Sequence, residues 1–335
     1  MLLPDPVAFT LFGIDIYWYG IIIAAAVVVG IWVAMREAGR IDYNQESVLD
    51  ICLIVIPAAI VGARFYYVVF QWDIFKGNFW SIFNPRTGGL AIYGAIIAAI
   101  IVIWVYSRVK KVSFLQILDI FAPAVVLGQA IGRWGNFFNQ EAYGFAIHNP
   151  KWQWFPFAVP IQNGMIDWHL ATFFYESLWC VIVFLFIWFF VRKRAKRRGT
   201  IVLSYFALYG FERAFVEILR TDSLTIAPIP GGLSYFELLA RGEATLAQLP
   251  VSTLLSLVVA AASVVILIVR SRRPIEPDTA LDESILDMPS SGERNLFLEP
   301  EGLLEEDVPA SPPSIAEFYE ARLAERQEAD EDSFQ

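Results

Sequence analysis

The sequence predicts an all-α polytopic membrane protein with seven transmembrane helices and a small extracytoplasmic head. Three observations lead to this prediction. The 335 residues are 57% hydrophobic and 15% aromatic, with a mean hydropathy of +0.53, which is too apolar for an ordinary soluble domain. The apolar residues come in long blocks, and a hydrocarbon core about 30 Å thick needs about 20 such residues per helix. Basic residues gather in every second connection between these blocks.

Seven blocks are long enough to cross a membrane. They span residues 18–35, 48–70, 89–107, 114–133, 170–191, 200–219 and 250–269. The two cysteines, Cys52 and Cys180, fall inside spans, so we expect two small core residues and no disulfide. No basic region precedes the first apolar block, so no cleavable signal peptide is expected. The sequence has no CxxC, HExxH or Walker motif, so it predicts no metal, no cofactor and no nucleic-acid partner.

The distribution of basic residues predicts the orientation. The connections after the first, third, fifth and seventh spans hold 14 basic residues: Arg36, Arg40, Arg108, Lys110, Lys111, six in 192–198 (RKRAKRR), Arg270, Arg272 and Arg273. The remaining connections hold Lys76, Arg86, Lys151, Arg220 and Arg241. Because basic loops stay in the cytoplasm, we expect the N-terminus outside and the C-terminus inside.

Residues 1–273 are predicted to form the membrane body, and residues 274–335 a separate tail. The tail has 18 Asp and Glu residues against three Arg residues, a net charge of −15, whereas the body carries about +6. Its Pro-, Ser- and Glu-rich composition favours a disordered cytoplasmic segment. It is either a solvated tail or a partner-binding segment for an unknown cytoplasmic protein, and we expect it to be dispensable for turnover. The head is expected from the extracytoplasmic segments 134–169 and 220–249.

Polar residues inside the spans lie mostly near the outer ends. Arg64 lies six residues before the outer end of its span, which is about 9 Å at a helix rise of about 1.5 Å per residue. Four other spans place polar groups at a comparable depth, namely Tyr19, Tyr93, Arg133 with Asn136, and Glu176. In the sixth span Arg213, Glu217 and Arg220 are spaced by four and seven residues and share one helical stripe. Asp119 lies about 21 Å deeper than Arg133 and is expected to be a structural polar partner.

Several arginines at one depth indicate an anionic ligand. Charged side chains within a span are costly and usually functional. A single pair such as Arg213 and Glu217 can also hold a helix bundle together without any ligand, so this pair alone leaves both interpretations open. In the outer leaflet the available anion is a phospholipid phosphate, which a planar guanidinium binds through two hydrogen bonds. The sequence therefore predicts an outer-leaflet site for an anionic lipid.

The densest polar stretch, GRWGNFFNQEAYG (132–144), follows directly on the fourth apolar block. It resembles the signature of the bacterial prolipoprotein diacylglyceryl transferases, G-R-x-G-N-F-x-N-x-E-x-x-G, at every fixed position. Other blocks that resemble the same family are WYG (18–20), GARFYYVVF (62–70), GGLAIYG (88–94), TFFYESLW (172–179) and YGFERAFVEILRTD (209–222). These blocks extend from about residue 13 to residue 269 and leave out the tail.

The resemblance implies an activity. Members of this family transfer the diacylglyceryl group of phosphatidylglycerol to the lipobox cysteine of a prolipoprotein, which forms a thioether and releases glycerol phosphate. The expected partners are therefore phosphatidylglycerol and prolipoprotein signal peptides. The family also implies a multi-pass protein of the bacterial cell membrane, with seven helices and an active site that faces the extracytoplasmic side.

The resemblance also implies roles for individual residues. Arg133 and Arg213 would act on the reacting phosphate and thiolate, and Asn136 and Asn139 would donate hydrogen bonds to the headgroup. The remaining matched residues are Glu141 and Glu217, which would orient arginines, Tyr19 and Tyr93, whose hydroxyls would lie near the headgroup, and Arg64, Glu176 and Arg220, which would complete the lipid-binding set. We also expect Gly135 to let the chain leave the helix after Arg133.

The chain departs from the family pattern at Tyr93, which stands where many members have a histidine. An imidazole base is therefore not expected at this position, although Tyr93 could relay a proton. His148 and His169 are expected to have loop or interfacial roles, because His169 is one place out of register with the family's histidine.

Three other functions fit the sequence less well than the transferase. An outer-leaflet anionic-lipid transporter or binding protein would use the same arginines, but repeated half-domains and an inner polar path would favour it, and the sequence has neither. A membrane scaffold would explain the topology but not the dense signature. A phosphatidyltransferase of the CDP-alcohol type would need an aspartate-rich metal motif, which the chain lacks.

Overall fold

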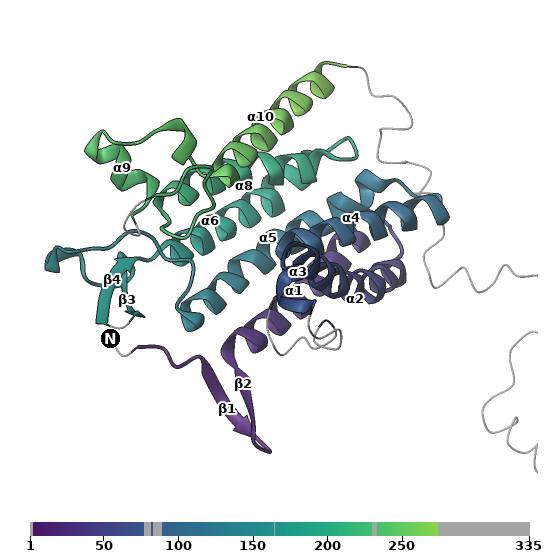
Figure 1. Ribbon diagram of the computed structural model, residues 1–335. Helices are drawn as coiled ribbons and strands as arrows, with labels where there is room; N and C mark the ends of the chain where they lie inside the picture. The colour runs from purple at the N-terminus through teal and green to yellow at the C-terminus, as the bar shows by residue number, and fades with distance from the viewer. Residues whose placement is uncertain (1–2, 77–81, 83–88, 164, 230–232, 274–335) are drawn as a thin grey trace, which may run out of the picture. The chain divides into compact units, whose positions relative to one another are not determined.

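A computed structural model describes residues 3–76, 82, 89–163, 165–229 and 233–273. Its long helices are α1 (Trp18–Arg40), α2 (Gln45–Phe70), α4 (Ile92–Val109), α5 (Phe114–Asn139), α6 (Thr172–Phe186), α8 (Thr200–Leu219) and α10 (Val251–Arg272) (Figure 1). Shorter helices are α3 (Trp72–Phe75), α7 (Arg192–Arg194) and α9 (Tyr235–Arg241). The predicted acidic tail, Arg86 and Gly88 lie outside the described residues.

Six helical segments are long and apolar enough to cross a membrane: Trp18–Arg40, Gln45–Phe70, Ile92–Val109, Phe114–Asn139, Thr172–Arg194 and Val251–Arg272. They coincide with six of the predicted spans, so the chain is a mostly helical, polytopic membrane protein. Helix α8 matches the remaining predicted span in both bounds. Its charged residues Glu212, Arg213 and Glu217 make it too polar to count as a span on composition alone. The seventh crossing therefore stays a prediction.

Helix α5 extends further than predicted. The helix continues into the signature (132–144) and ends at Asn139, so Gly135 lies inside the helix. The expectation that Gly135 ends the helix is thus wrong. A Cβ on Gly135 would lie 2.7 Å from Cδ2 of Tyr19, so this glycine makes room for the Tyr19 ring. The chain turns later, where Gln140 and Ala142 adopt φ values of 52° and 57°.

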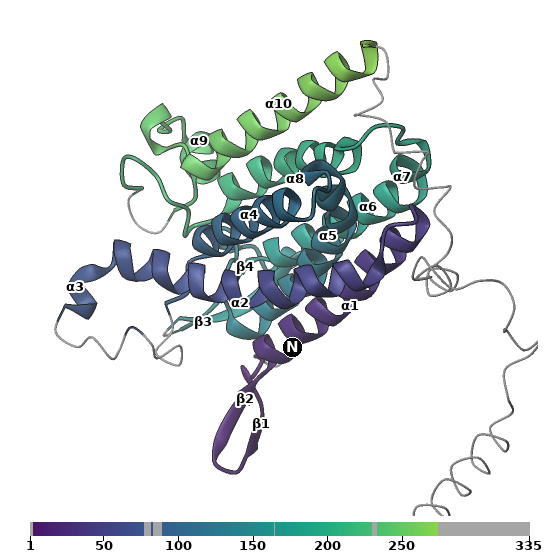
Figure 2. The ribbon, with the colours of Figure 1, turned by 90° about the vertical axis from the view of Figure 1, so that its right-hand side faces the viewer.

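The other helices pack around α5. It contacts α1, α6, α8 and α4, while α10 packs on α8 and α2 on α4 (Figures 1 and 2). The α2–α4 contact depends on two glycines, because a Cβ on Gly94 would lie 2.2 Å from the carbonyl oxygen of Gly62. Such close backbone approach is typical of helices that pack within a bilayer. Side chains such as Leu53 and Phe65 point outwards and are 73% and 70% exposed, as expected for surface that faces lipid.

One end of the helix bundle is basic. We call it the basic end, and it holds the C-terminal ends of α1, α4 and α10, the residues 192–198 after α6, and the N-terminal ends of α5 and α8. There the buried carboxylate of Glu37 pairs with Arg40 at 2.5 Å and with Arg192 at 2.9 Å. Asp119 of α5 accepts hydrogen bonds from the backbone N–H groups of Gly199 (2.5 Å) and Val202 (2.8 Å). It thereby caps the N-terminus of α8, which confirms its structural role.

Two short antiparallel hairpins add to the predicted helices. Strands β1 (Val7–Leu11) and β2 (Ile14–Tyr17) precede α1, and β3 (Ala158–Asn163) and β4 (Met165–Leu170) precede α6. The residues that join β1 to β2, Phe12 and Gly13, have φ values of 51° and 77°, as in a type I′ turn. The burial of β1 does not alternate along the strand, because its second half, Phe9–Leu11, is exposed throughout.

The cap on α8 gives a prediction for stability. In Asp119→Ala two backbone N–H groups lose their acceptor, so we expect the free energy of unfolding to fall by about 1–3 kcal/mol. Asp50→Ala, which removes an exposed carboxylate from α2, is the matched control and should have little effect. Thermal unfolding of both variants in detergent micelles checks this, and equal midpoints would contradict the capping role.

Candidate active site

The candidate site is built around Glu176. This carboxylate lies in α6 and is fully buried. It pairs with Arg133 of α5, and Nη1 of Arg213, from α8, donates to both of its oxygens at 3.1 Å. Three helices that are distant in sequence therefore meet at one carboxylate, at the opposite end of α5 from the basic end (Figure 1). Breaking such a buried ion pair is costly, because the remaining charge has no solvent to stabilise it.

Arg213 has a second acidic partner. Its Nη2 lies 2.5 Å from Oε2 of Glu217, one helical turn further along α8. This contact agrees with the predicted stripe of Arg213 and Glu217. Both arginines are mostly buried, with Arg133 18% and Arg213 20% exposed, so each retains a small accessible surface.

The signature residues continue the network from Arg133. Nη1 of Arg133 lies 3.5 Å from Oδ1 of Asn136, and Nδ2 of Asn136 donates to Glu141 at 2.8 Å. Nδ2 of Asn139 donates to the same Glu141 oxygen at 3.3 Å. Glu141 thus binds two amides, and its link to Arg133 runs through Asn136. The ring of Tyr19 packs against Gly135, and the charges of Glu141 and Arg133 act on its hydroxyl group.

Arg220 lies beyond the end of α8 and binds Asp222. Its Nε and Nη2 donate to the two oxygens of Asp222 at 2.8 and 2.7 Å. Burial alone lowers the pKa of Arg220, but the hydrogen bond and charge of Asp222 raise it above its ordinary value. Burial alone raises the pKa of Asp222, but Arg220 brings it below its ordinary value. The guanidinium of Arg220 is therefore engaged outside the cluster around Glu176.

Arg64 and Tyr93 belong to the α2–α4 side of the molecule. Arg64 donates to the carbonyl oxygens of Ile82 (2.8 Å) and Gly89 (3.1 Å), and its guanidinium lies 5.0 Å from the centre of the Phe75 ring. Tyr93 is 50% exposed, and its ring centre lies 6.4 Å from that of Tyr66. Among the described contacts, none joins Tyr93 to Arg133 or Arg213.

Both histidines lie in the head. Nδ1 of His169, in β4, lies 2.9 Å from the carbonyl oxygen of Gly144, and the imidazole packs on the Tyr143 ring at 4.5 Å. His148 is exposed. These positions agree with the expected loop and interfacial roles.

Sequence reasoning passes over Glu212. This residue directly precedes Arg213 in α8, is only 7% exposed, and neither of its side-chain oxygens has a hydrogen-bond donor among the described residues. The charges that act on it include Glu176, Arg133 and Arg213. The sequence does contain a signal for Glu212, because a charged residue inside a predicted span is costly and usually functional. Glu212 lies outside the stripe of Arg213, Glu217 and Arg220, because adjacent residues of a helix point in different directions.

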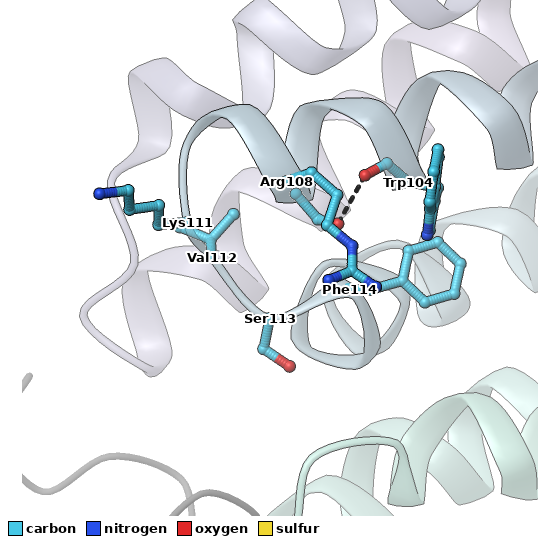
Figure 3. Close-up of a pocket in the computed structure, with 7 residues that line it drawn as sticks. Trp104, Arg108, Lys111, Val112, Ser113 and Phe114 are labelled. Carbon is cyan, nitrogen blue, oxygen red and sulfur yellow. Dashed lines mark hydrogen bonds between the residues drawn. The ribbon is translucent and has the colours of Figure 1, made fainter.

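A cavity of about 550 Å³ lies elsewhere, between the end of α4 and the start of α5 (Figure 3). Its lining includes Trp104, Ser107, Arg108 and Phe114. Arg133 lies 19 residues beyond Phe114 in the same helix, about 28 Å away at the usual helix rise. This cavity is therefore part of the basic end and not of the arginine site.

Comparison with known proteins identifies the family. The family model described as prolipoprotein diacylglyceryl transferase matches residues 6–269. The chain belongs to this family. The match spans every residue of the site described above, from Tyr19 to Asp222, and it ends before the acidic tail.

Individual relatives agree with the family match. The chain is 47% identical to the phosphatidylglycerol–prolipoprotein diacylglyceryl transferase of Finegoldia magna over 225 residues, which cover 67% of this chain and 87% of the relative. It is 46% identical to the protein of the same name from Clostridium kluyveri over 228 residues, covering 67% and 88%. The corresponding protein of Clostridioides difficile is 43% identical over 225 residues, covering 67% and 87%.

Because Glu176 pairs with two arginines, we expect Glu176→Gln to lower the stability of the protein strongly. This substitution leaves Arg133 and Arg213 without their common counter-ion, so we expect the free energy of unfolding to fall by about 3–5 kcal/mol. The matched control is Asp222→Asn, which breaks an arginine–carboxylate pair whose acid is 52% exposed. It should cost at most about 1 kcal/mol. Unfolding in detergent measures both, and similar losses would refute the central role of Glu176.

Proposed function

We propose that this chain transfers a diacylglyceryl group from phosphatidylglycerol to the lipobox cysteine of prolipoproteins. Family membership supports this activity, and the curated relatives carry it in their names. The structural observation that carries the proposal is the pair of arginines, Arg133 and Arg213, held side by side by the buried Glu176. The alternative, a transporter or binding protein for an anionic lipid, has no support from the family match.

The arginine pair suits a phosphodiester. A guanidinium has five N–H donors, and neither arginine is saturated by its contacts with the described residues. Both retain exposed surface, so the free donors of Arg133 and Arg213 can bind the phosphate oxygens of phosphatidylglycerol. Because Glu176 already fixes the two side chains, little reorganisation is needed when the lipid arrives.

The proposed reaction is a substitution at carbon. The substrate thiol loses its proton, and the sulfur forms a bond to the C3 carbon of the diacylglyceryl group. The bond between this carbon and the phosphate oxygen breaks, and its electron pair leaves with glycerol phosphate. Arg133 and Arg213 stabilise the charge that develops on the leaving phosphate and lower the energy of the thiolate.

The other site residues have supporting roles in this proposal. Asn136 and Asn139, which Glu141 orients, present amide N–H groups to the headgroup, and Tyr19 contributes its hydroxyl. Glu217 holds Arg213 in place. Arg64, Arg220 and Tyr93 lie outside the cluster around Glu176, so we assign them to the more distant parts of the lipid or of the peptide.

We further propose the membrane arrangement. Helix α8 is the seventh span, because its three charged residues are buried within the protein or paired there. The basic end faces the cytoplasm, in line with the positive-inside rule. The arginine site, the hairpins and residues 220–249 then face the extracytoplasmic side of the cell membrane. Residues 274–335 form a cytoplasmic tail that turnover does not require.

The activity is tested with purified protein, phosphatidylglycerol vesicles and a lipobox-cysteine peptide. We expect release of glycerol phosphate together with a matching gain in peptide mass, and neither with a Cys→Ser peptide. Arg133→Ala and Arg213→Ala should each lower the rate by about 10²–10³-fold, as for other lost oxyanion donors. Arg241→Ala, in α9, is the exposed control, and the chain truncated after Arg273 should react at the full rate.

Two results would contradict this proposal. Near-normal turnover in folded Arg133→Ala and Arg213→Ala would exclude the arginine pair from the reaction. Lipid binding by the folded wild-type protein without any release of glycerol phosphate would favour the anionic-lipid binding protein.

The orientation is tested separately by labelling intact cells. In a chain without Cys52 and Cys180, a cysteine at His148 should react with a membrane-impermeant thiol reagent. A cysteine at Lys196 should react only after the membrane is permeabilised, because the basic end faces the cytoplasm. The opposite labelling pattern would reverse the proposed orientation.

A further inference from the structure

The structure contains a carboxyl group that the mechanism above does not use. Four glutamates surround the arginine pair, and three have polar partners. Glu176 binds both arginines, Glu217 binds Arg213, and Glu141 accepts hydrogen bonds from two asparagine amides. Glu212 is 7% exposed, close to the 5% of Glu217, yet no described residue donates a hydrogen bond to either of its oxygens. A buried polar group without a partner is rare and is often found at functional sites.

Glu212 lies among charges of both signs. The charged and titratable groups that interact with it come from three helices: Arg133 of α5, Glu176 and Cys180 of α6, and Arg213 of α8. Tyr209 lies three residues before it in α8. Helix α10, which also packs on α8, has no titratable side chain between Val251 and Val269. Burial and Glu176 oppose a charge on Glu212, whereas the two arginines favour it. No hydrogen bond fixes either form.

The proposed reaction lacks a proton acceptor. The lipobox thiol has to lose its proton before sulfur attacks carbon, since the thiolate is the nucleophile. Glu176, Glu217 and Glu141 are engaged by cationic or amide donors. Tyr93 is half exposed and lies beside Tyr66. Both histidines lie in the head, and His169 is already hydrogen-bonded to the backbone.

We propose that Glu212 takes up the proton of the substrate thiol. This inference rests on the proposed transferase activity and adds the group that serves as its base. The S–H proton passes to a Glu212 oxygen, directly or through one water molecule. The sulfur lone pair forms the new S–C bond, and the electrons of the broken C–O bond leave on glycerol phosphate. Glu212 then returns its proton to that phosphate, so no outside reactant is needed.

The test compares two nucleophiles in Glu212→Gln. One lipobox peptide carries cysteine, and the other carries selenocysteine, whose selenol is already ionised at neutral pH and needs no base. With the cysteine peptide we expect the variant to be slower by about 10²-fold or more, the usual contribution of a general base. With the selenocysteine peptide it should match the wild-type rate. Raising the pH should also rescue the cysteine reaction in the variant, because hydroxide then ionises the thiol.

Glutamine has the same shape as glutamate, and no hydrogen bond to Glu212 is lost, so this variant is expected to fold. Glu212→Asp, which keeps the acid but shortens the side chain, is the second variant and should show a smaller version of the same nucleophile-dependent defect. If only the aspartate variant folds, its ratio of cysteine to selenocysteine rates decides the question. Glu243→Gln, an exposed site in residues 220–249, is the matched control.

Each outcome separates the two proposals. Equal loss with both nucleophiles would show that Glu212 only supports the structure and would overturn this inference. Wild-type rates in both variants with the cysteine peptide would overturn it as well. If the wild-type protein transfers lipid to neither peptide, the proposed function itself fails.

Discussion

The arrangement of the site depends on one buried set of ion pairs, in which the carboxylate of Glu176 binds the guanidinium groups of both Arg133 and Arg213. A buried charge is costly without a partner of opposite sign, and Glu176 supplies this partner to both arginines. Together they fix the relative positions of α5, α6 and α8. The pairing also aligns the two guanidinium groups before any lipid binds. The same contacts thus give structural stability and, in the proposed function, readiness for a lipid phosphate without rearrangement of the helices.

Helix α5 links this centre to the other end of the molecule. Asp119 caps the start of α8, and Arg133 lies 14 residues further along α5. At about 3.6 residues per turn, 14 residues are close to four full turns, so both side chains leave α5 on the same face. Arg213 correspondingly lies 11 residues after Val202 in α8, about three turns. The two helices are held together near both ends, so α8 cannot slide along α5 without breaking a buried contact.

The long helices and the pairing of arginines with carboxylates are predictable from the sequence, because apolar length sets the spans and position in a span sets depth. Depth does not say which side of the bundle a residue faces, and for that reason Arg64 and Tyr93 match the site in depth but lie on the α2–α4 side. The role of Gly135 depends on a ring from another helix, which no local propensity reveals. The end of α8 is predictable from the sequence, but the pairing of Arg220 with Asp222 depends on how the chain turns there, which the sequence does not reveal.

The charges of the cluster explain why a base inside it matters. Arg133 and Arg213 contribute two positive charges, and Glu176, Glu217 and the deprotonated Glu212 contribute three negative ones. A phosphodiester adds one negative charge, and a thiolate would add another in a region of low dielectric constant, where an uncompensated charge is costly. If the thiol proton left for the solvent, the site would have to hold this second charge alone. When Glu212 takes the proton, its own negative charge disappears as the thiolate forms, so the net charge of the site stays constant. A carboxylate next to the arginine pair can make this exchange, whereas Tyr93 has no described contact with either arginine.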